Sequence, residues 1–188
     1  MVSVGAVGSG VGDEVIASAY AWHQIAHAIV LVGATPVFAD IDYWSGTLSA
    51  EKAAAKITPQ TKAILVGNTN GHPAAWDPFR ALARERGIKL IEDTTEAIGS
   101  RYKGQVVGTF GDISIFDFSQ PSALCCGEGA MIVTDDHELA SELRYHRSRG
   151  LDERFSIAIA SRVPFQASIS DVTAARGLEQ LDRLDEIL

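Results

Sequence analysis

The chain has 188 residues, a length that suits one domain with its own hydrophobic core. Apolar residues make up 46% of it and charged residues 21%, and the formal net charge is -8. This acidic balance argues against a nucleic-acid partner, because phosphate backbones are bound by clustered Lys and Arg. It leaves open a phosphorylated small molecule, which backbone N–H groups at a helix start can hold.

The two cysteines, Cys125 and Cys126, are adjacent, and no His or further Cys stands near them at metal-ligand spacing. They predict reduced thiols rather than a disulfide framework. The start of the chain has no basic region before its apolar residues, unlike a signal peptide, and the apolar stretch 25–32 is too short to cross a bilayer. We therefore expect a cytoplasmic protein with no membrane partner.

Short β-rich runs alternate with helical patterns along the chain. In chain order, we expect strand 14–18, helix 21–32, strand 36–40, helix 49–56, strand 63–67, helix 77–86, strands 89–93, 113–118 and 131–134, and helix 136–147. Asp77 is a candidate N-cap and Gly87 a candidate helix stop. The alternation predicts an α/β fold, in which a mostly parallel sheet with right-handed crossovers lies between two helical layers.

The two ends of the chain are less regular. We expect no helix before the first strand. A long helix is expected from Ser170 to the end, with nothing to pack it back. One face of it would carry Val172, Ala175, Leu178, Leu181 and Leu184. The chain is thus expected to be a single domain, with a core over 8–150, a loop over 150–168 and a C-terminal helix over 169–188.

The glycine-rich stretch from Gly5 to Gly12 looks at first like a phosphate loop. A dinucleotide fingerprint needs a strand before it and a helix after it. Here Asp13, Glu14 and a strand follow instead. A flexible turn is therefore favoured, with phosphate binding as the alternative.

Glu92 and Asp93 end an apolar strand, where carboxylates of open α/β sheets face the ligand crevice. The alternative is an N-cap or a surface charge. Trp22 lies in the first helical pattern, where it could be a core residue or stack on a planar ligand. His23 and His27 share that pattern, and such a His is more often packed or exposed than catalytic.

Seven segments, in order, resemble one family. They read GDEVI, GATPVFADID, ITPQTKAILV, GHPAAWD, IEDTTEAIGSRYKGQVVGTFGDISIFDF, GEGAMIVTDD and LEQLDRLDEIL. The chain resembles the DegT/DnrJ/EryC1/StrS family of sugar aminotransferases over residues 8–150 and again over 168–188. The resemblance implies the large domain of a fold-type I enzyme that is dimeric and uses pyridoxal phosphate. It implies transfer of an amino group, often from glutamate, to a keto-sugar nucleotide.

The resemblance also assigns site residues. Asp93 falls on the Asp that pairs with the pyridinium nitrogen and lets the ring act as an electron sink. Trp22 falls on the aromatic residue that stacks on the cofactor ring. Glu128 falls on the Glu of the family's glycine-rich motif, between two glycines that permit a tight backbone path.

Three positions depart from the family pattern. Ser122 stands where the family has its Schiff-base lysine, and a serine hydroxyl forms no imine. Asp117 stands where the family has a phosphate-binding Ser, and its carboxylate would repel a phosphate dianion. Glu96 stands where the family has a Gln near the ring.

Further departures are expected near the ends. The family's Asn and Arg before the final helix fall at Gln166 and Ser168. The family's first phosphate-binding turn would lie before Met1, and its small domain after the final helix.

The departures predict an aminotransferase-like protein without ordinary transaminase activity. One alternative is an active pyridoxal or pyridoxamine phosphate enzyme, an aminotransferase or a dehydratase, that uses an unusual base or a partner subunit. Another is a binding module for a sugar nucleotide or other small molecule, and a third is a fragment with no independent function. Because the family is dimeric, we expect a homodimer or pairing with a fuller homologue.

Overall fold

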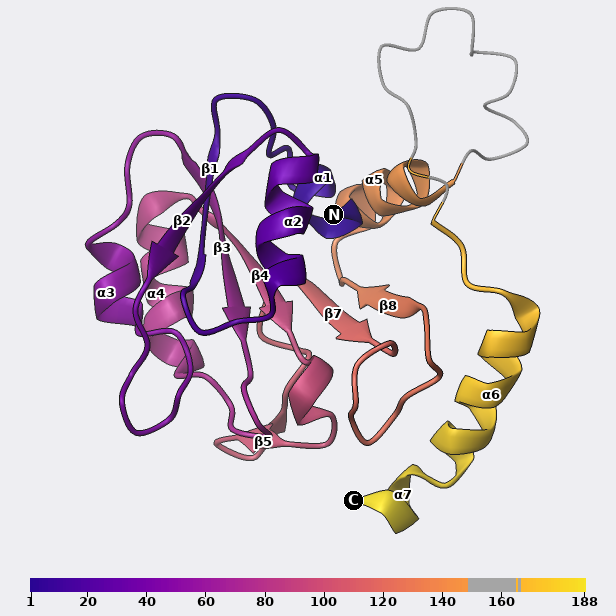
Figure 1. Cartoon of the computed structure of the whole chain (residues 1–188). Coiled ribbons are helices and arrows are strands. Elements are labelled where there is room, and N and C mark those ends of the chain that lie inside the picture. Colours follow the sequence, from indigo (N-terminus) through magenta and orange to yellow (C-terminus); the bar gives the residue numbers. More distant parts are fainter. Residues whose placement is uncertain (149–164, 166) are drawn as a thin grey trace, which may run out of the picture.

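A computed structural model of the chain describes residues 1–148, 165 and 167–188. Its main sheet has six strands in the order β2-β1-β3-β4-β7-β8 (Figure 1). The strands are β1 (Glu14–Ser18), β2 (Thr35–Ala39), β3 (Thr61–Gly67), β4 (Lys89–Asp93), β7 (Ile113–Asp117) and β8 (Ala130–Val133). All neighbours pair in parallel except β7 and β8, which are antiparallel. The expected mostly parallel α/β sheet is confirmed.

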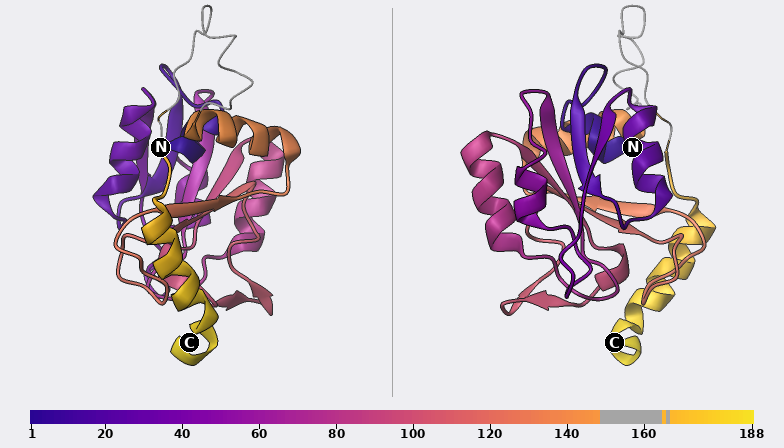
Figure 2. Two further views of the ribbon diagram at one scale, coloured as in Figure 1. Left: turned by 90° about the vertical axis from the view of Figure 1, so that its right-hand side faces the viewer. Right: turned by 60° about the vertical axis from the view of Figure 1, so that its left-hand side comes forward.

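Helices cover both faces of this sheet, which gives the expected three layers (Figure 2). The helices before the C-terminal segment are α1 (Val2–Ala6), α2 (His23–Leu31), α3 (Ala50–Ala54), α4 (Trp76–Arg86) and α5 (His137–Arg147). Helices α3 and α4 pack on one face around Trp76 and Phe79. Helices α1 and α2 pack on the other face, where Val4 and Ile29 meet the sheet. Successive strand residues enter opposite cores, as strand geometry requires.

The start of the chain differs from the expectation. Residues Val2–Ala6 form α1, so the prediction of no helix before the first strand is wrong. Val4 and Ala6 are buried, and this packing fixes a helix that is too short to form alone. The glycine-rich stretch then turns at Gly8 and Gly12, whose φ angles are 79° and 90°. The chain continues into β1, as the turn interpretation predicts.

Of the two boundary residues predicted for helix α4, one is confirmed and one is wrong. Its N-cap is Ala75, so Asp77 is not the cap. Asp77 lies in the first turn, where its charge complements the helix dipole, and it pairs with Lys103. Gly87 ends the helix with a φ of 65°, as predicted.

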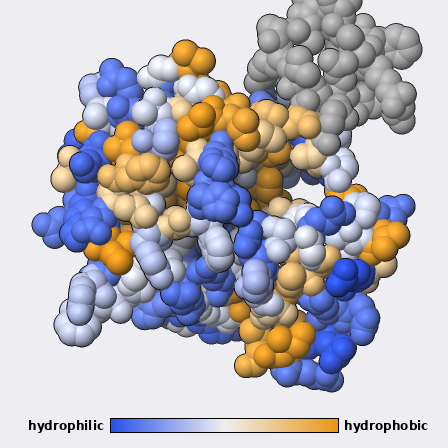
Figure 3. Space-filling view, viewed as in Figure 1, coloured by the Kyte–Doolittle hydropathy of each residue, from blue (hydrophilic) through white to orange (hydrophobic). Residues whose placement is uncertain are grey.

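The C-terminal helix is broken in two, contrary to the single helix expected. Ser170 is the N-cap of α6 (Asp171–Asp182) and Arg183 is its C-cap, and α7 (Leu184–Ile187) follows. The expected apolar face is largely exposed, with Val172 76% and Leu178 63% accessible. Figure 3 shows apolar surface at the start of α6 and at α7. Helix α6 instead turns Thr173, Gly177 and Gln180 toward the 119–129 loop.

Two smaller features complete the described chain. The sequence did not predict a hairpin of β5 (Arg101–Tyr102) and β6 (Gln105–Val106), nor the short 3-10 helix η1 (Thr95–Ala97). Most of the expected 150–168 loop, with Gln166, lies outside the described residues. In the part of the chain that is described, no helix has the length and apolar character needed to cross a membrane.

Candidate functional site

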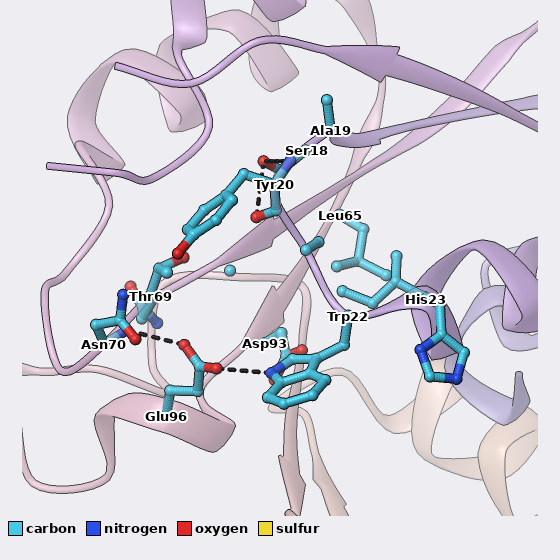
Figure 4. A pocket seen from close by; sticks show the side chains of 14 residues that line it. Ser18, Ala19, Tyr20, Trp22, His23, Leu65, Thr69, Asn70, Asp93 and Glu96 are labelled. Atoms are coloured by element: carbon cyan, nitrogen blue, oxygen red, sulfur yellow. Dashed lines mark hydrogen bonds between the residues drawn. The ribbon is translucent and has the colours of Figure 1, made fainter. Parts of the chain in front are cut away.

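A crevice of about 460 Å³ opens at the carboxyl edge of the sheet (Figure 4). It is formed where β1, β3 and β4 end and their connecting segments begin, the usual place for a ligand in an open α/β sheet. Its lining residues are Ser18, Ala19, Tyr20, Ala21, Trp22, His23, Ile25, Leu65, Gly67, Asn68, Thr69, Asn70, Asp93 and Glu96. Three of the candidate residues, Trp22, Asp93 and Glu96, therefore meet in one crevice.

Asp93 is the last residue of β4 and faces the crevice. Its Oδ1 accepts hydrogen bonds from the Thr95 backbone N at 3.0 Å and from Thr95 Oγ1 at 2.6 Å. Burial raises the pKa of Asp93 above its ordinary value of 3.8, and the charges of Asp117 and Glu96 raise it further, against the hydrogen bonds from Thr95. Among the described residues no donor is bound to Oδ2, so this oxygen can accept from a ligand.

Glu92 points away from the crevice, because neighbouring strand residues face opposite sides of a sheet. Its side chain is fully buried and its carboxylate accepts five hydrogen bonds. The donors are Asn68 Nδ2, the backbone N of Gly108, Phe110 and Gly111, and Ser114 Oγ, at 2.7 to 3.2 Å. Glu92 therefore holds the core together, while its neighbour Asp93 is the member of the pair that faces the crevice.

Trp22 precedes α2 and is 47% exposed. Its indole Nε1 donates to Glu96 Oε1 at 2.6 Å. The other carboxylate oxygen of Glu96 accepts from the Asn70 backbone N at 2.8 Å. Figure 4 shows the two bonds on opposite sides of the Glu96 carboxylate, one toward Asn70 and one toward Trp22. Trp22 is thus a surface of the crevice and not a core residue.

Asp117 and Ser122 lie at the same edge of the sheet, since β7 runs parallel to β4, but they are not among the lining residues. Asp117 Oδ1 accepts from Ser119 N at 2.8 Å and from Ser119 Oγ at 2.7 Å. Ser122 Oγ donates to the Leu124 carbonyl at 2.7 Å. Both side chains therefore hold the 119–129 loop in shape.

The crevice fits one part of pyridoxal phosphate better than the others. Asp93 Oδ2 can accept from a protonated ring nitrogen, and the face of Trp22 can stack on the ring. Within the described chain, however, the lining contains no Lys and no Arg. The ring has a fitting site here, whereas the described lining residues offer neither an amine for an imine nor a cation for the phosphate.

The structure also places the other residues that the sequence analysis named. Glu128 accepts from Thr173 Oγ1 at 2.9 Å and so ties the loop to α6. Ser168 is exposed. His23 lines the crevice and contacts His27 ring to ring.

Most of the lining residues were not singled out from the sequence, and Asn70 and Tyr20 are two of them. Asn70 has a φ of 51°, and its place before Gly71 is a turn signal that could have marked a loop at this strand end. Tyr20 is held by Ser18, whose Oγ accepts from Tyr20 N and donates to Tyr20 O. No pattern in the sequence marks that turn as part of a crevice.

Comparison with known proteins finds relatives by sequence and by structure, and three of them show what the chain is similar to. The chain is 39% identical over 185 residues to a GDP-perosamine synthase of Caulobacter vibrioides, covering 97% of the chain and 49% of that protein. It superposes on DesV of S. venezuelae, solved in complex with a ketimine intermediate, with a TM-score of 0.86 at 33% identity, over 98% of the chain and 49% of DesV. It superposes on NtdA of Bacillus subtilis, solved with bound cofactor PMP, with a TM-score of 0.88 at 27% identity, over 98% of the chain and 42% of NtdA.

The chain thus spans about half the length of the relatives that it matches. The model of the DegT/DnrJ/EryC1/StrS aminotransferase family matches residues 1–188, and the fold and the order of motifs agree with that match. The chain belongs to the DegT/DnrJ/EryC1/StrS aminotransferase family.

Proposed function

We propose that this chain keeps the ring-binding part of an aminotransferase crevice but does not carry out transamination through a Schiff base of its own. The observation that carries the proposal is the state of Ser122, at the position of the family lysine. Its hydroxyl donates to the Leu124 carbonyl, and among the described residues it makes no hydrogen bond to a carboxylate, an imidazole or an amine. An imine requires a primary amine, which displaces the aldehyde oxygen as water, and serine has none.

Asp93 and Trp22 support the retained half of the proposal. Asp93 offers a carboxylate oxygen at the strand end that has no positive partner among the described residues, and burial raises the pKa of this carboxyl. A protonated ring nitrogen would supply that partner, and stacking on Trp22 would orient the ring. We therefore propose a non-covalent site for a pyridoxal or pyridoxamine type of ring. When bound, such a cofactor supplies an electron sink.

The substrate class to be tested is inferred only from a related protein. The C. vibrioides relative is a GDP-perosamine synthase. A nucleotide-linked sugar is therefore the first ligand class to test on this chain.

Self-association stays a prediction, to be measured by light scattering.

An absorbance titration with pyridoxal phosphate tests the proposal, followed by borohydride reduction and mass spectrometry. We expect no stable pyridoxyl adduct on any specific lysine, and no amino transfer from glutamate. Asp93→Asn should weaken whatever non-covalent binding is seen, because it removes the negative charge from the ring-nitrogen site. An adduct on one defined lysine would contradict the proposal and identify a relocated amine.

Two restoring variants sharpen the test. Ser122→Lys supplies an amine, and Asp117→Ser removes a carboxylate from the position of the family's phosphate-binding hydroxyl. The double variant should capture the cofactor better than either single one, because the two changes act on different parts of it. Ser148→Lys, which adds a lysine at the end of α5 and outside the crevice lining, is the matched control.

A further inference from the structure

Glu96 occupies the point where three crevice segments meet. Residue 96 belongs to η1 after β4, Trp22 precedes α2, and Asn70 follows β3. The two partners of the carboxylate are 74 and 26 residues away in the chain. A single side chain therefore joins the rims of three separate strand ends (Figure 4).

The hydrogen-bond chemistry suits a carboxylate at this position better than an amide. Trp22 Nε1–H and Asn70 N–H are both donors, and each points at a different oxygen of Glu96. An ionised carboxylate can accept on both oxygens, whereas the amide of a glutamine has one oxygen and one NH₂ group. A glutamine at this position would turn its NH₂ toward one of the two donors and lose that bond. The Glu at position 96 is thus matched to an indole at position 22.

The Trp22 side chain has few other restraints. Almost half of it is exposed, and in the described chain its ring contacts no other aromatic ring. As the residue that caps α2, it makes no side-chain capping bond. The bond to Glu96 is therefore the polar contact that fixes the plane of the indole beside the crevice.

We propose that Glu96 is a positioning residue, which fixes the Trp22 indole as a wall of the crevice and does not itself bind the ligand. A wall held in place before binding loses less side-chain entropy when a planar ring stacks on it. The effect on ligand binding rests on the ring site proposed above, whereas the effect on the indole does not depend on it.

The indole is tested in the free protein by NMR of ¹⁵N-labelled tryptophan. The three tryptophans give separate Nε1–H signals, and Trp22→Phe identifies the one that matters. In Glu96→Ala the Trp22 signal should shift, and its exchange with water should become about tenfold faster, as expected for loss of a hydrogen bond to a charged group. In Glu96→Gln, both the signal shift and the exchange rate should lie between those of the unchanged protein and those of Glu96→Ala. The Trp76 signal, whose Nε1 donates to Asn68, should stay unchanged.

Glu85→Ala is the matched control, because Glu85 is an exposed carboxylate on α4 that is not part of the crevice. It should leave all three signals in place. A Trp22 signal that is unchanged in Glu96→Ala would overturn the proposal.

A binding cycle with pyridoxal phosphate as the probe separates positioning from direct contact. When position 22 is Trp, Glu96→Ala should weaken the binding of the probe several-fold. In the Trp22→Phe background, the same change should leave the affinity unaltered. An equal change in both backgrounds would mean that Glu96 touches the ligand, which contradicts the proposal. If the unchanged protein binds no probe, the ring site fails, and the NMR result alone decides the role of Glu96.

Discussion

Glu92→Gln tests how far one buried carboxylate stabilises the fold. The two oxygens of Glu92 accept unequal sets of donors. Oε2 accepts from Phe110 N, Gly111 N and Ser114 Oγ, and Oε1 accepts from Asn68 Nδ2 and Gly108 N. Gln has the same shape but only one acceptor, so it will place its oxygen toward the set of three and its NH₂ toward the set of two.

The magnitude follows from the bonds that cannot be remade. Asn68 cannot simply reverse its amide to meet the new NH₂ group, because its Oδ1 already accepts from Ala74 N and Trp76 Nε1. Two hydrogen bonds to a charged group are lost, each worth about 1.5–3 kcal/mol. Relief of the desolvation of the charge offsets part of this loss. We expect the free energy of unfolding to fall by about 3 kcal/mol, a large share of the roughly 5–15 kcal/mol typical of a domain.

Urea denaturation followed by circular dichroism measures this change. Glu85→Gln is the control, since its partner Arg86 lies on the exposed side of α4, and it should change stability by less than about 0.5 kcal/mol. A loss below about 1 kcal/mol in Glu92→Gln would refute the reasoning. It would mean that the network relaxes around a single acceptor.

Three further changes have definite outcomes. Asp93→Asn should raise stability at neutral pH, because burial raises the pKa of Asp93 in the folded state and so disfavours its charged form there. The protonated native carboxyl stabilises the folded state fully below about pH 3.8, and this stabilisation is lost as the pH rises through the raised pKa. The gain from Asn should therefore vanish in acid, as measured by unfolding at a series of pH values. Gln180→Ala should loosen α6 by about 1–3 kcal/mol, because it removes a pair of bonds to Cys125 N and O at 2.7 and 2.6 Å, and hydrogen exchange of the α6 amides should quicken while that of β3 does not. Gly87→Ala should cost roughly 1–2 kcal/mol in a thermal melt, because a φ of 65° strains an L-residue while open space surrounds the added methyl group.

The sequence predicted the sheet well where local signals agree. The bounds of β1 and β4 are those expected, because each has adjacent apolar residues between turn or helix signals. Strand alternation also separates Glu92 from Asp93, although the direction of the alternation needs a known neighbour in the core. In the structure this neighbour is Ile91, which faces the α1 and α2 side of the sheet.

Features that depend on contacts distant in sequence could not be predicted. The bond between Trp22 and Glu96 joins residues 74 apart, and nothing at either position marks the other as a partner. Helix α1 exists because Val4 finds a buried place beside the sheet, whereas its five residues carry no helix signal of their own.

Helix α6 shows a related limit of periodicity. The spacing of Val172, Leu178 and Leu181 predicts which residues share a face, but not which face turns toward the body. The packed face here has Gly177, where an added Cβ would lie 3.0 Å from Cys126 Sγ. The absence of a side chain permits that close approach, and the bonds of Gln180 hold it.

Two of the departures from the family pattern, at positions 117 and 122, lie close together in this fold. Asp117 and Ser122 both belong to the end of β7 and the loop that follows, where each binds a neighbour within two residues. Asp93 and Trp22 belong to other strand ends and meet across the crevice. The side chains of Asp117 and Ser122 can change without disturbing the sheet, because their hydrogen bonds are made within the loop and not through the core. A change at position 122, such as the proposed loss of imine chemistry, is therefore compatible with an unchanged shape of the crevice around Asp93 and Trp22.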